Sequence, residues 1–184
     1  MNLENYLAEH IELFNKSKNV LQDIENIACR ICECLINNRK VLIAGNGGSA
    51  ADAQHFAAEF TGRFEVERSG LNAIALTTDT SALTAIANDY GYHKVFSRQL
   101  AAIGNKGDVF IGISTSGKSE SIINAFNVAR EKGITSIMMT GKTGEPNVAD
   151  FVIRAQSEKT SLIQEFHSFA LHCICKIVDE KFAK

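Results

Sequence analysis

Hydrophobic residues follow two different patterns along the chain, and the change falls near residue 40. Over the first forty residues apolar side chains recur every three or four positions, as at Leu3, Leu7 and Ile11, which is typical of amphipathic helices. After that, short and almost wholly apolar runs alternate with stretches of helical period. The predicted strands are 41–44, 73–76, 109–114, 134–140 and 151–154, and the predicted helices are 49–61, 81–88, 95–103, 119–131 and 161–182.

This alternation predicts an α/β fold in which helices cover both faces of a parallel sheet. A strand that is apolar at nearly every position is buried on both faces, unlike the strands of a hairpin-built sheet with one solvated face. The expected architecture is a five-stranded, three-layer sheet of the flavodoxin-like or Rossmann-like kind, with an N-terminal helical extension over residues 1–38. Ligands of such folds bind beyond the carboxyl ends of the strands, and the polar motifs of this chain all fall at that edge.

Composition limits the classes of function. The chain has 184 residues, 45% of them hydrophobic, which suits one domain with a substantial core. Its formal net charge of −2 gives no electrostatic reason to bind nucleic acid or an anionic membrane. The apolar runs are too short to span a bilayer and the N-terminus lacks a signal-peptide pattern, so we expect a cytoplasmic protein. The five cysteines are expected to be free thiols, and Cys29-x-x-Cys32 is interpreted as two small buried residues of a helix and not as half of a zinc site.

The most informative stretch is Asn46-Gly-Gly-Ser49, which follows the first predicted strand. Small residues let backbone N–H groups approach an anion, and the N-terminus of the next helix adds a favourable dipole. On that helix His55 and Glu59 stand four residues apart and therefore share a face. An anion site and an acid/base or metal-ligand pair are thus predicted on one helix, although a His and a Glu at this spacing also occur on ordinary helix surfaces.

A second candidate anion site is Ser114-Thr-Ser-Gly-Lys-Ser119, between a predicted strand and a predicted helix. Hydroxyl groups and the first amides of a helix can each donate a hydrogen bond to a phosphate. The stretch from Gly112 to Ser119 also satisfies the Walker A pattern of nucleotide-binding proteins. A nucleotidase would need an acidic magnesium ligand at the end of another strand, for which Asp79 is the one residue at hand, so we do not favour this alternative.

The last predicted helix carries Gln164, His167 and His172, which are close in rotation at about 3.6 residues per turn. Polar residues along one side of an otherwise apolar helix are usually on its solvated face. We expect that placement for His167, and likewise for His10 and His93.

Taken together, these segments resemble the sugar isomerase (SIS) domains and, among them, the phosphoheptose isomerases. The matching stretches cover nearly the whole chain and are G-N-G-G-S, A-Q-H-F-A-A-E-F-T-G-R, A-I-A-N-D-Y-G, G-I-S-T-S-G-K-S, T-G-K and I-Q-E-x-H. The resemblance implies an isomerase that interconverts sedoheptulose 7-phosphate and D-glycero-D-manno-heptose 7-phosphate through an enediol, as the first step of ADP- or GDP-heptose biosynthesis for lipopolysaccharide core or capsule. It also implies a SIS domain over residues 39–184, and a helical pair over 1–38 that packs on the core and at the subunit interfaces of a homotetramer.

The resemblance also assigns roles to residues at matching positions. Glu59 and His172 correspond to the acid/base pair of the family. In its zinc-bearing members His55, Glu59, Gln164 and His172 correspond to the metal ligands, so about one zinc ion per subunit is expected. The residues implied in substrate binding are Asn46, Gly47, Gly48, Ser49, Arg63, Asn88, Asp89, Ser114, Thr115, Ser116, Ser119 and Gln164.

The chain departs from the family pattern at two places. Lys118 stands where members commonly have asparagine, so the Walker A match looks like a one-residue coincidence. Ser161-Leu162 stands where members often have an acidic residue or proline followed by arginine. The alternative function is that of a non-catalytic regulator such as the DnaA initiator-associating protein, which the chain resembles at Q-H-F-A-A and L-T-A-I-A-N-D. That protein lacks the glutamate and the second histidine, whereas Glu59 and His172 are present here.

Overall fold

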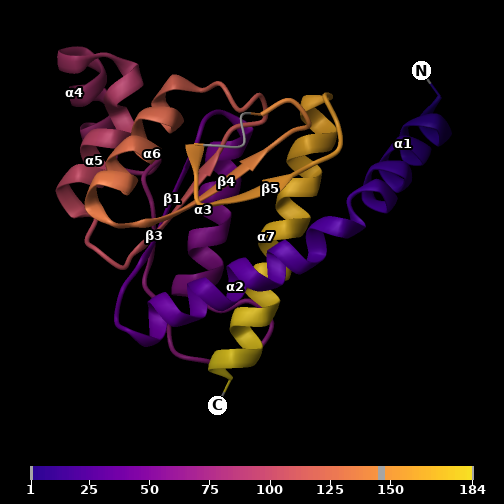
Figure 1. The fold of residues 1–184 in the computed structure, drawn as a ribbon, viewed down its shortest axis with the longest axis horizontal. Coiled ribbons are helices and arrows are strands. Elements are labelled where there is room, and N and C mark those ends of the chain that lie inside the picture. Colours follow the sequence, from indigo (N-terminus) through magenta and orange to yellow (C-terminus); the bar gives the residue numbers. More distant parts are fainter. Residues whose placement is uncertain (1, 145–147, 184) are drawn as a thin grey trace.

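The computed structural model describes residues 2–144 and 148–183, and over these ranges it shows a parallel sheet of five strands between two layers of helices (Figure 1). The strands are β1 (Val41–Gly45), β2 (Ala73–Ala75), β3 (Val109–Ile113), β4 (Thr135–Thr140) and β5 (Phe151–Arg154), in the order β2-β1-β3-β4-β5. The helices are α1 (Leu3–Lys16), α2 (Leu21–Ile36), α3 (Gly48–Thr61), α4 (Thr80–Tyr90), α5 (Val95–Ile103), α6 (Glu120–Lys132) and α7 (Thr160–Phe182), with short 3-10 turns η1 (Lys18–Val20) and η2 (Tyr92–Lys94). The predicted fold class is confirmed, and the strand order is the flavodoxin-like one.

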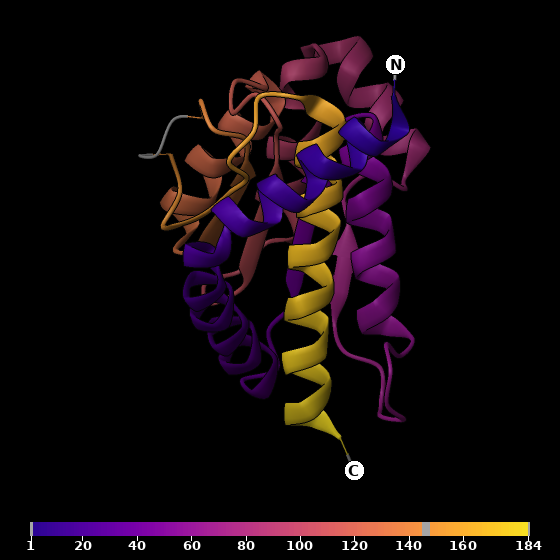
Figure 2. The ribbon, with the colours of Figure 1, turned by 90° about the vertical axis from the view of Figure 1, so that its right-hand side faces the viewer.

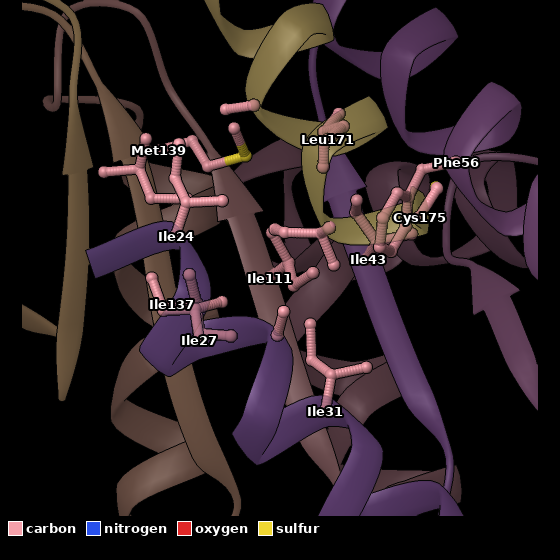
Figure 3. Close-up of a cluster of buried hydrophobic side chains, with 14 of the residues drawn as sticks. Ile24, Ile27, Ile31, Ile43, Phe56, Ile111, Ile137, Met139, Leu171 and Cys175 are labelled. Carbon is pink, nitrogen blue, oxygen red and sulfur yellow. The ribbon is translucent and has the colours of Figure 1, made fainter. Parts of the chain in front are cut away.

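The central strands are buried on both faces because their side chains alternate between two cores. Val41 and Ile43 of β1 face the first core, and Leu42 and Ala44 face the second. The second core lies under α5 and α6. In the first core α2, α3 and α7 pack on the sheet, and Figure 3 shows Ile24, Ile27 and Ile31 of α2, Phe56 of α3, and Leu171 and Cys175 of α7 against Ile43, Ile111, Ile137 and Met139.

The N-terminal helix α1 extends away from the body of the molecule (Figure 1). Its C-terminal part is anchored on α7, where the Phe14 ring lies 5.0 Å from the Phe169 ring between centroids. Further out, Leu3, Leu7 and Ile11 are 72%, 61% and 56% exposed. A row of exposed aliphatic side chains on a projecting helix is unusual for a surface that stays in water.

The cysteines are free thiols, as predicted, but the expected burial of Cys29 is wrong because it lies on the solvent side of α2. Cys32, Cys34 and Cys175 are buried, Cys29 is exposed, and each is a free thiol. Within the described part of the chain, the helices fall short of the length and apolar character that a membrane crossing requires.

At Gly112 the sheet and α6 are in close contact. A Cβ at this position would lie 2.5 Å from Phe126 Cζ and 2.8 Å from Ile122 Cγ2, and both of those side chains are buried. Gly112 therefore serves packing inside β3 and does not open a phosphate loop. Asp79 caps α4 by accepting from Ala82 N–H at 2.9 Å, and it follows β2, which does not neighbour β3. The structure gives the Walker A alternative no support.

We expect Gly112→Ala to destabilise the protein by about 1–3 kcal/mol, because the added methyl overpacks the contact between β3 and α6. Urea denaturation followed by circular dichroism would measure the change. An unchanged free energy of unfolding would show that α6 moves away from the sheet without loss.

Candidate active site

Residues 46–49, the glycine turn, lead directly from β1 into α3. Gly47 has φ 57° and ψ −123°, which side chains disfavour. A Cβ at Gly48 would displace the side-chain amide of Gln164, which lies against it. The turn thus requires glycine at position 47, and it places the first amides of α3, where Ser49 is buried, at the carboxyl edge of the sheet.

The side chain of Asn46 ties the glycine turn to two other segments. Its Oδ1 accepts from the Tyr92 hydroxyl at 2.7 Å, and its Nδ2 donates to Ser121 Oγ at 3.1 Å. Asn46, which the resemblance assigns to substrate, is bonded to protein on both sides and so positions the turn. The exposed pair Asn88 and Asp89 lies at the end of α4, shortly before Tyr92, and Asn88 Nδ2 donates to Asp89 Oδ1 at 2.9 Å.

Residues 114–119, the hydroxyl loop, lead from β3 into α6 and are held in shape by their own side chains. Ser114 Oγ lies 3.1 Å from Ser119 Oγ and accepts from Ser119 N–H at 3.3 Å. Ser116 Oγ accepts from the N–H two residues further on, at 3.2 Å. The Thr115 carbonyl accepts from an N–H of the turn that follows β4, at 3.0 Å. Ser116 is exposed and Ser114 is buried, so the loop presents only part of its hydroxyl groups to solvent.

The glycine turn and the hydroxyl loop meet at the topological switch point of the sheet, between β1 and β3. β1 and β3 are neighbours, but the glycine turn leads to α3 on one face and the hydroxyl loop leads to α6 on the other (Figure 1). Such a switch point opens a crevice beyond the carboxyl ends of the strands, where ligands of α/β sheets bind. Amide and hydroxyl donors therefore converge at a place suited to a phosphate group.

Helices α3 and α7 run side by side and in the same direction over the first face of the sheet (Figure 2). Pairs of residues that contact each other across the two helices therefore occur in the same order along both helices. Asp52 Oδ1 accepts from Ser168 Oγ at 3.0 Å, and one turn further the rings of His55 and His172 meet edge to face, with 5.2 Å between centroids. We call this line of contacts the α3–α7 seam.

The chemistry-bearing residues gather near the C-terminal part of the seam. Glu59 Oε1 lies 2.9 Å from His55 Nε2, and the side chains are 21% and 55% exposed respectively. Phe64, in the loop after α3, stacks on the His172 ring with 5.5 Å between centroids. The structure therefore brings together His55, Glu59 and His172, a carboxylate and two imidazoles from helices distant in sequence.

Asp52 adds a second carboxylate to the seam. Its Oδ2 is buried and finds no hydrogen-bond partner within residues 2–144 and 148–183. Burial raises the pKa of the Asp52 carboxyl, although the hydrogen bond from Ser168 and the nearby His55 and His172 act in the opposite direction. Because Asp52 bonds to Ser168, it helps to set how α3 and α7 align.

Two further residues assigned by resemblance make their observed contacts outside the His55–Glu59–His172 group. Gln164 lies at Gly48, eight residues before His172 and so about 12 Å from it along the axis of α7. Arg63 follows the C-terminus of α3, is exposed, and lies 3.9 Å from Glu67 Oε2 through its Nε. In the described ranges the structure shows no three His, Cys, Asp or Glu side chains close enough together to hold one metal ion.

The expectation that His167 is solvated is wrong. The side chain is 0% exposed, and its Nε2 lies 3.2 Å from the Thr140 carbonyl at the end of β4. Burial lowers the pKa of His167 to about 4, so the imidazole is neutral at pH 7. Rotation around a helix cannot tell which polar residue faces solvent when the helix is covered on more than one side, as α7 is by α2 and α3.

Four other polar residues of the site were missed in the sequence. The sequence does contain a signal for Asp52 and Ser168. Asp52 precedes His55 by three residues and Ser168 precedes His172 by four, so each shares a helix face with that histidine. Tyr92 and Ser121 had none, since each reaches Asn46 only through the folding of distant segments.

Comparisons with known proteins identify the family to which the chain is similar. A model of the SIS domain family matches residues 5–141. The chain is 49% identical over 187 residues to the phosphoheptose isomerase of Aneurinibacillus thermoaerophilus, covering 97% of this chain and 94% of that protein. It is 48% identical over 178 residues to the phosphoheptose isomerase of Helicobacter pylori strain P12, covering 95% of this chain and 92% of that protein.

Solved structures give the same result. The phosphoheptose isomerase of Neisseria gonorrhoeae superposes with a TM-score of 0.90 and 42% identity, covering 97% of each chain. That of Francisella tularensis superposes with a TM-score of 0.93 and 38% identity, covering 97% of this chain and 96% of that one. The sugar isomerase domain of an RpiR transcription factor from Sphaerobacter thermophilus, at 19% identity and a TM-score of 0.67, shares the fold.

The buried His167 predicts a specific dependence of stability on pH. Its pKa is about 4 in the folded chain and near 6.5 in the unfolded chain, so between these values only the unfolded state binds the proton. The stabilisation is complete above pH 6.5 and is lost as the pH falls toward 4, which amounts to roughly 2 kcal/mol between pH 7 and pH 5. Urea denaturation of the wild type and of His167→Gln at both pH values measures it. Equal losses in the two proteins would contradict the assignment.

Proposed function

The chain belongs to the SIS domain family and, within it, to the phosphoheptose isomerases, and we propose that it interconverts sedoheptulose 7-phosphate and D-glycero-D-manno-heptose 7-phosphate at the α3–α7 seam. We place the reaction there because Glu59 contacts His55 on α3, and His55 contacts His172 on the aligned helix α7. Helix α3 is also the helix that begins at the glycine turn. The non-catalytic regulator is not favoured, because the relatives over nearly the whole chain are isomerases.

The reaction moves one proton between neighbouring carbons. From the ketose, a base takes a proton from C1 while the C2 carbonyl oxygen gains one, which gives an enediol; the O1 hydroxyl then loses its proton as C2 gains one, which leaves an aldehyde at C1. We assign the carbon-bound proton to Glu59, whose carboxylate is held by His55. We assign proton transfer at the oxygens to His172, because the nitrogens of an imidazole ring can both donate and accept a proton. Each correctly placed group contributes roughly 10²–10⁴ to the rate.

The phosphate group would serve as the anchor at the switch point. The hydroxyls of Ser116 and Ser119, with Ser114 and Thr115 shaping the loop, and the first amides of α3 offer neutral donors to a dianion. Binding energy from this remote group orients the reacting carbons.

The distance between anchor and chemistry favours a site shared between subunits. Gly48 and Glu59 are eleven residues apart on α3, about 16 Å along its axis. A seven-carbon sugar phosphate, with bonds of about 1.5 Å, spans roughly 9 Å from C1 to phosphorus. We therefore propose a homotetramer in which Glu59 and His172 act on a sugar whose phosphate is held by a neighbouring chain. The exposed row Leu3, Leu7 and Ile11 on α1 supplies apolar surface for such an assembly.

A zinc ion is the proposed cofactor. The donors suit zinc in chemistry, with two imidazoles, a carboxylate and an amide oxygen. His55, Glu59 and His172 would hold the ion, and Gln164, which lies near Gly48 and away from these residues in one chain, would complete the set from a neighbouring chain of the tetramer. When bound, zinc would polarise the substrate carbonyl and stabilise the negative charge that develops beside it. On the basis of the family we also propose a cytoplasmic location and a role in ADP- or GDP-heptose biosynthesis for lipopolysaccharide core or capsule.

We expect Glu59→Gln to lower kcat on sedoheptulose 7-phosphate by roughly two to four decades, because the amide keeps the shape but cannot accept the proton. Ser119→Ala is the matched control. It should weaken substrate binding by about 1.5–3 kcal/mol, the value for a hydrogen bond to a charged group, with a smaller effect on kcat. Near-wild-type turnover in Glu59→Gln would remove the assignment of the base.

Elemental analysis of protein purified without chelator should find about one zinc per chain. His55→Ala and His172→Ala should each lose the metal, because each removes an imidazole ligand. Full activity after exhaustive chelation, with no metal detected, would end the metal proposal and leave Glu59 and His172 as an acid/base pair alone.

Light scattering should give the mass of a tetramer. Mixing Glu59→Gln chains with Ser119→Ala chains, after mild dissociation and reassembly, should yield more activity than either parent at substrate concentrations well below the KM of Ser119→Ala, since some shared sites would combine two intact halves. A fully active monomer would contradict the shared site.

A further inference from the structure

Arg68 and Asp179 form an ion pair in the interior of the protein. Their side chains are 1% and 3% exposed, and Arg68 Nε lies 2.6 Å from Asp179 Oδ1. Arg68 comes from the loop after α3, and Asp179 lies on α7, seven residues beyond His172 and so on nearly the same face. The pair therefore joins the two helices at the end of the α3–α7 seam that carries Glu59 and His172.

The guanidinium group completes the C-terminus of α3. Arg68 Nη2 donates to the Glu59 carbonyl at 2.7 Å, and Nη1 donates to the Phe60 carbonyl at 2.9 Å and the Gly62 carbonyl at 3.3 Å. The last carbonyls of a helix have no partner within the helix, and without one the last turn frays. Because Glu59 belongs to that last turn, the side chain that satisfies its carbonyl also fixes where its carboxylate lies.

The carboxylate of Asp179 fixes the other side of the site. Its Oδ2 accepts from Glu65 N–H at 2.7 Å and from Val66 N–H at 3.0 Å. These amides directly follow Phe64, whose ring stacks on His172. Asp179 thus holds in place the residue that packs against the second member of the acid/base pair.

Stability alone does not account for such a pair. Removing two charges from water is unfavourable, and apolar residues of similar volume are often as stabilising as a buried ion pair. Apolar residues cannot hold the carbonyls at the end of α3 and the two loop amides in fixed directions, as this ion pair does. We propose that Arg68 and Asp179 form a positioning clamp for the isomerisation, which places Glu59 through its backbone carbonyl and His172 through Phe64. This inference rests on the proposed function of Glu59 and His172.

The test uses Arg68→Lys in the full-length protein, with sedoheptulose 7-phosphate as substrate. A lysine ammonium can pair with Asp179 but cannot also span the Glu59 and Phe60 carbonyls, so the charge stays and the positioning is lost. We expect kcat to fall about 10- to 100-fold, as for a displacement of about 1 Å of a reacting group. KM should stay within about threefold, because the phosphate loops lie about 16 Å away along α3.

Lys176→Met is the matched control. Lys176 Nζ lies 2.9 Å from Glu65 Oε2 in an exposed pair, which joins the same loop to the same helix without touching Glu59 or its turn. We expect wild-type kcat and KM. Hydrogen exchange gives a readout independent of turnover: the Gly62 and Leu71 amides, bonded to the Ala58 and Phe60 carbonyls, should exchange faster in Arg68→Lys and not in Lys176→Met.

Asp179→Asn serves as the second variant and should lower kcat in the same way. Wild-type kcat in folded Arg68→Lys and Asp179→Asn would overturn the clamp, as would an equal loss in Lys176→Met. Failure of both variants to fold would also overturn it, because the pair would then hold the fold together without a separate positioning role. If Glu59→Gln keeps its activity, the proposed function fails instead; if Glu59→Gln is inactive while Arg68→Lys is fully active, only the clamp fails.

Discussion

The shared direction of α3 and α7 is the constraint on which the rest of the site depends. Both helices follow parallel strands and lie on the same face of the sheet, so they have to run the same way. Contacts between them therefore advance together, from Gly48 with Gln164, through Asp52 with Ser168, to His55 with His172. An antiparallel arrangement would have placed His172 beside the glycine turn and Glu59 beside the start of α7. The sheet topology thus determines that the His172 imidazole, near the end of the chain, lies against the ring of His55, which in turn contacts the Glu59 carboxylate.

The same geometry separates binding from chemistry. The donors of the glycine turn and the hydroxyl loop lie at the switch point of the sheet, whereas Glu59 and His172 lie toward the far end of α3. Hydrogen-bond donors suit the switch point. A chain with a net charge of −2 has no general attraction for a sugar phosphate, so it needs a local binding site. The buried Arg68–Asp179 pair suits the C-terminal end of α3, because proton transfer depends on the position of the reacting groups more than on substrate affinity. The proposed site shared between subunits would reconcile the distance between these two ends with the length of one heptose phosphate.

Much of the fold could be predicted from the sequence, since the apolar runs at β1 and β3 and the glycine after β1 are local signals. The spacing of His55 and Glu59 was local too, and the structure shows them in contact. The remaining features depend on pairs distant in sequence. Tyr92 and Asn46, or Arg68 and Asp179, carry no mark in the chain that links them. The prediction for His167 was wrong because helical rotation indicates a face of the helix but not which elements cover that face. The separation of Gln164 from His172 by about two turns, in contrast, follows from the sequence alone.

The central claim is that Glu59 and His172 move a proton through an enediol of a heptose 7-phosphate. Isomerisation of sedoheptulose 7-phosphate in D₂O, followed by proton and carbon NMR, tests it most directly. The account predicts that an aldoheptose 7-phosphate forms and carries deuterium at C2 in at least part of the product, because a proton held on a carboxylate exchanges with solvent before it returns to carbon. No aldose product, or a product formed entirely with protium at C2 as in a direct hydride shift, would contradict the account.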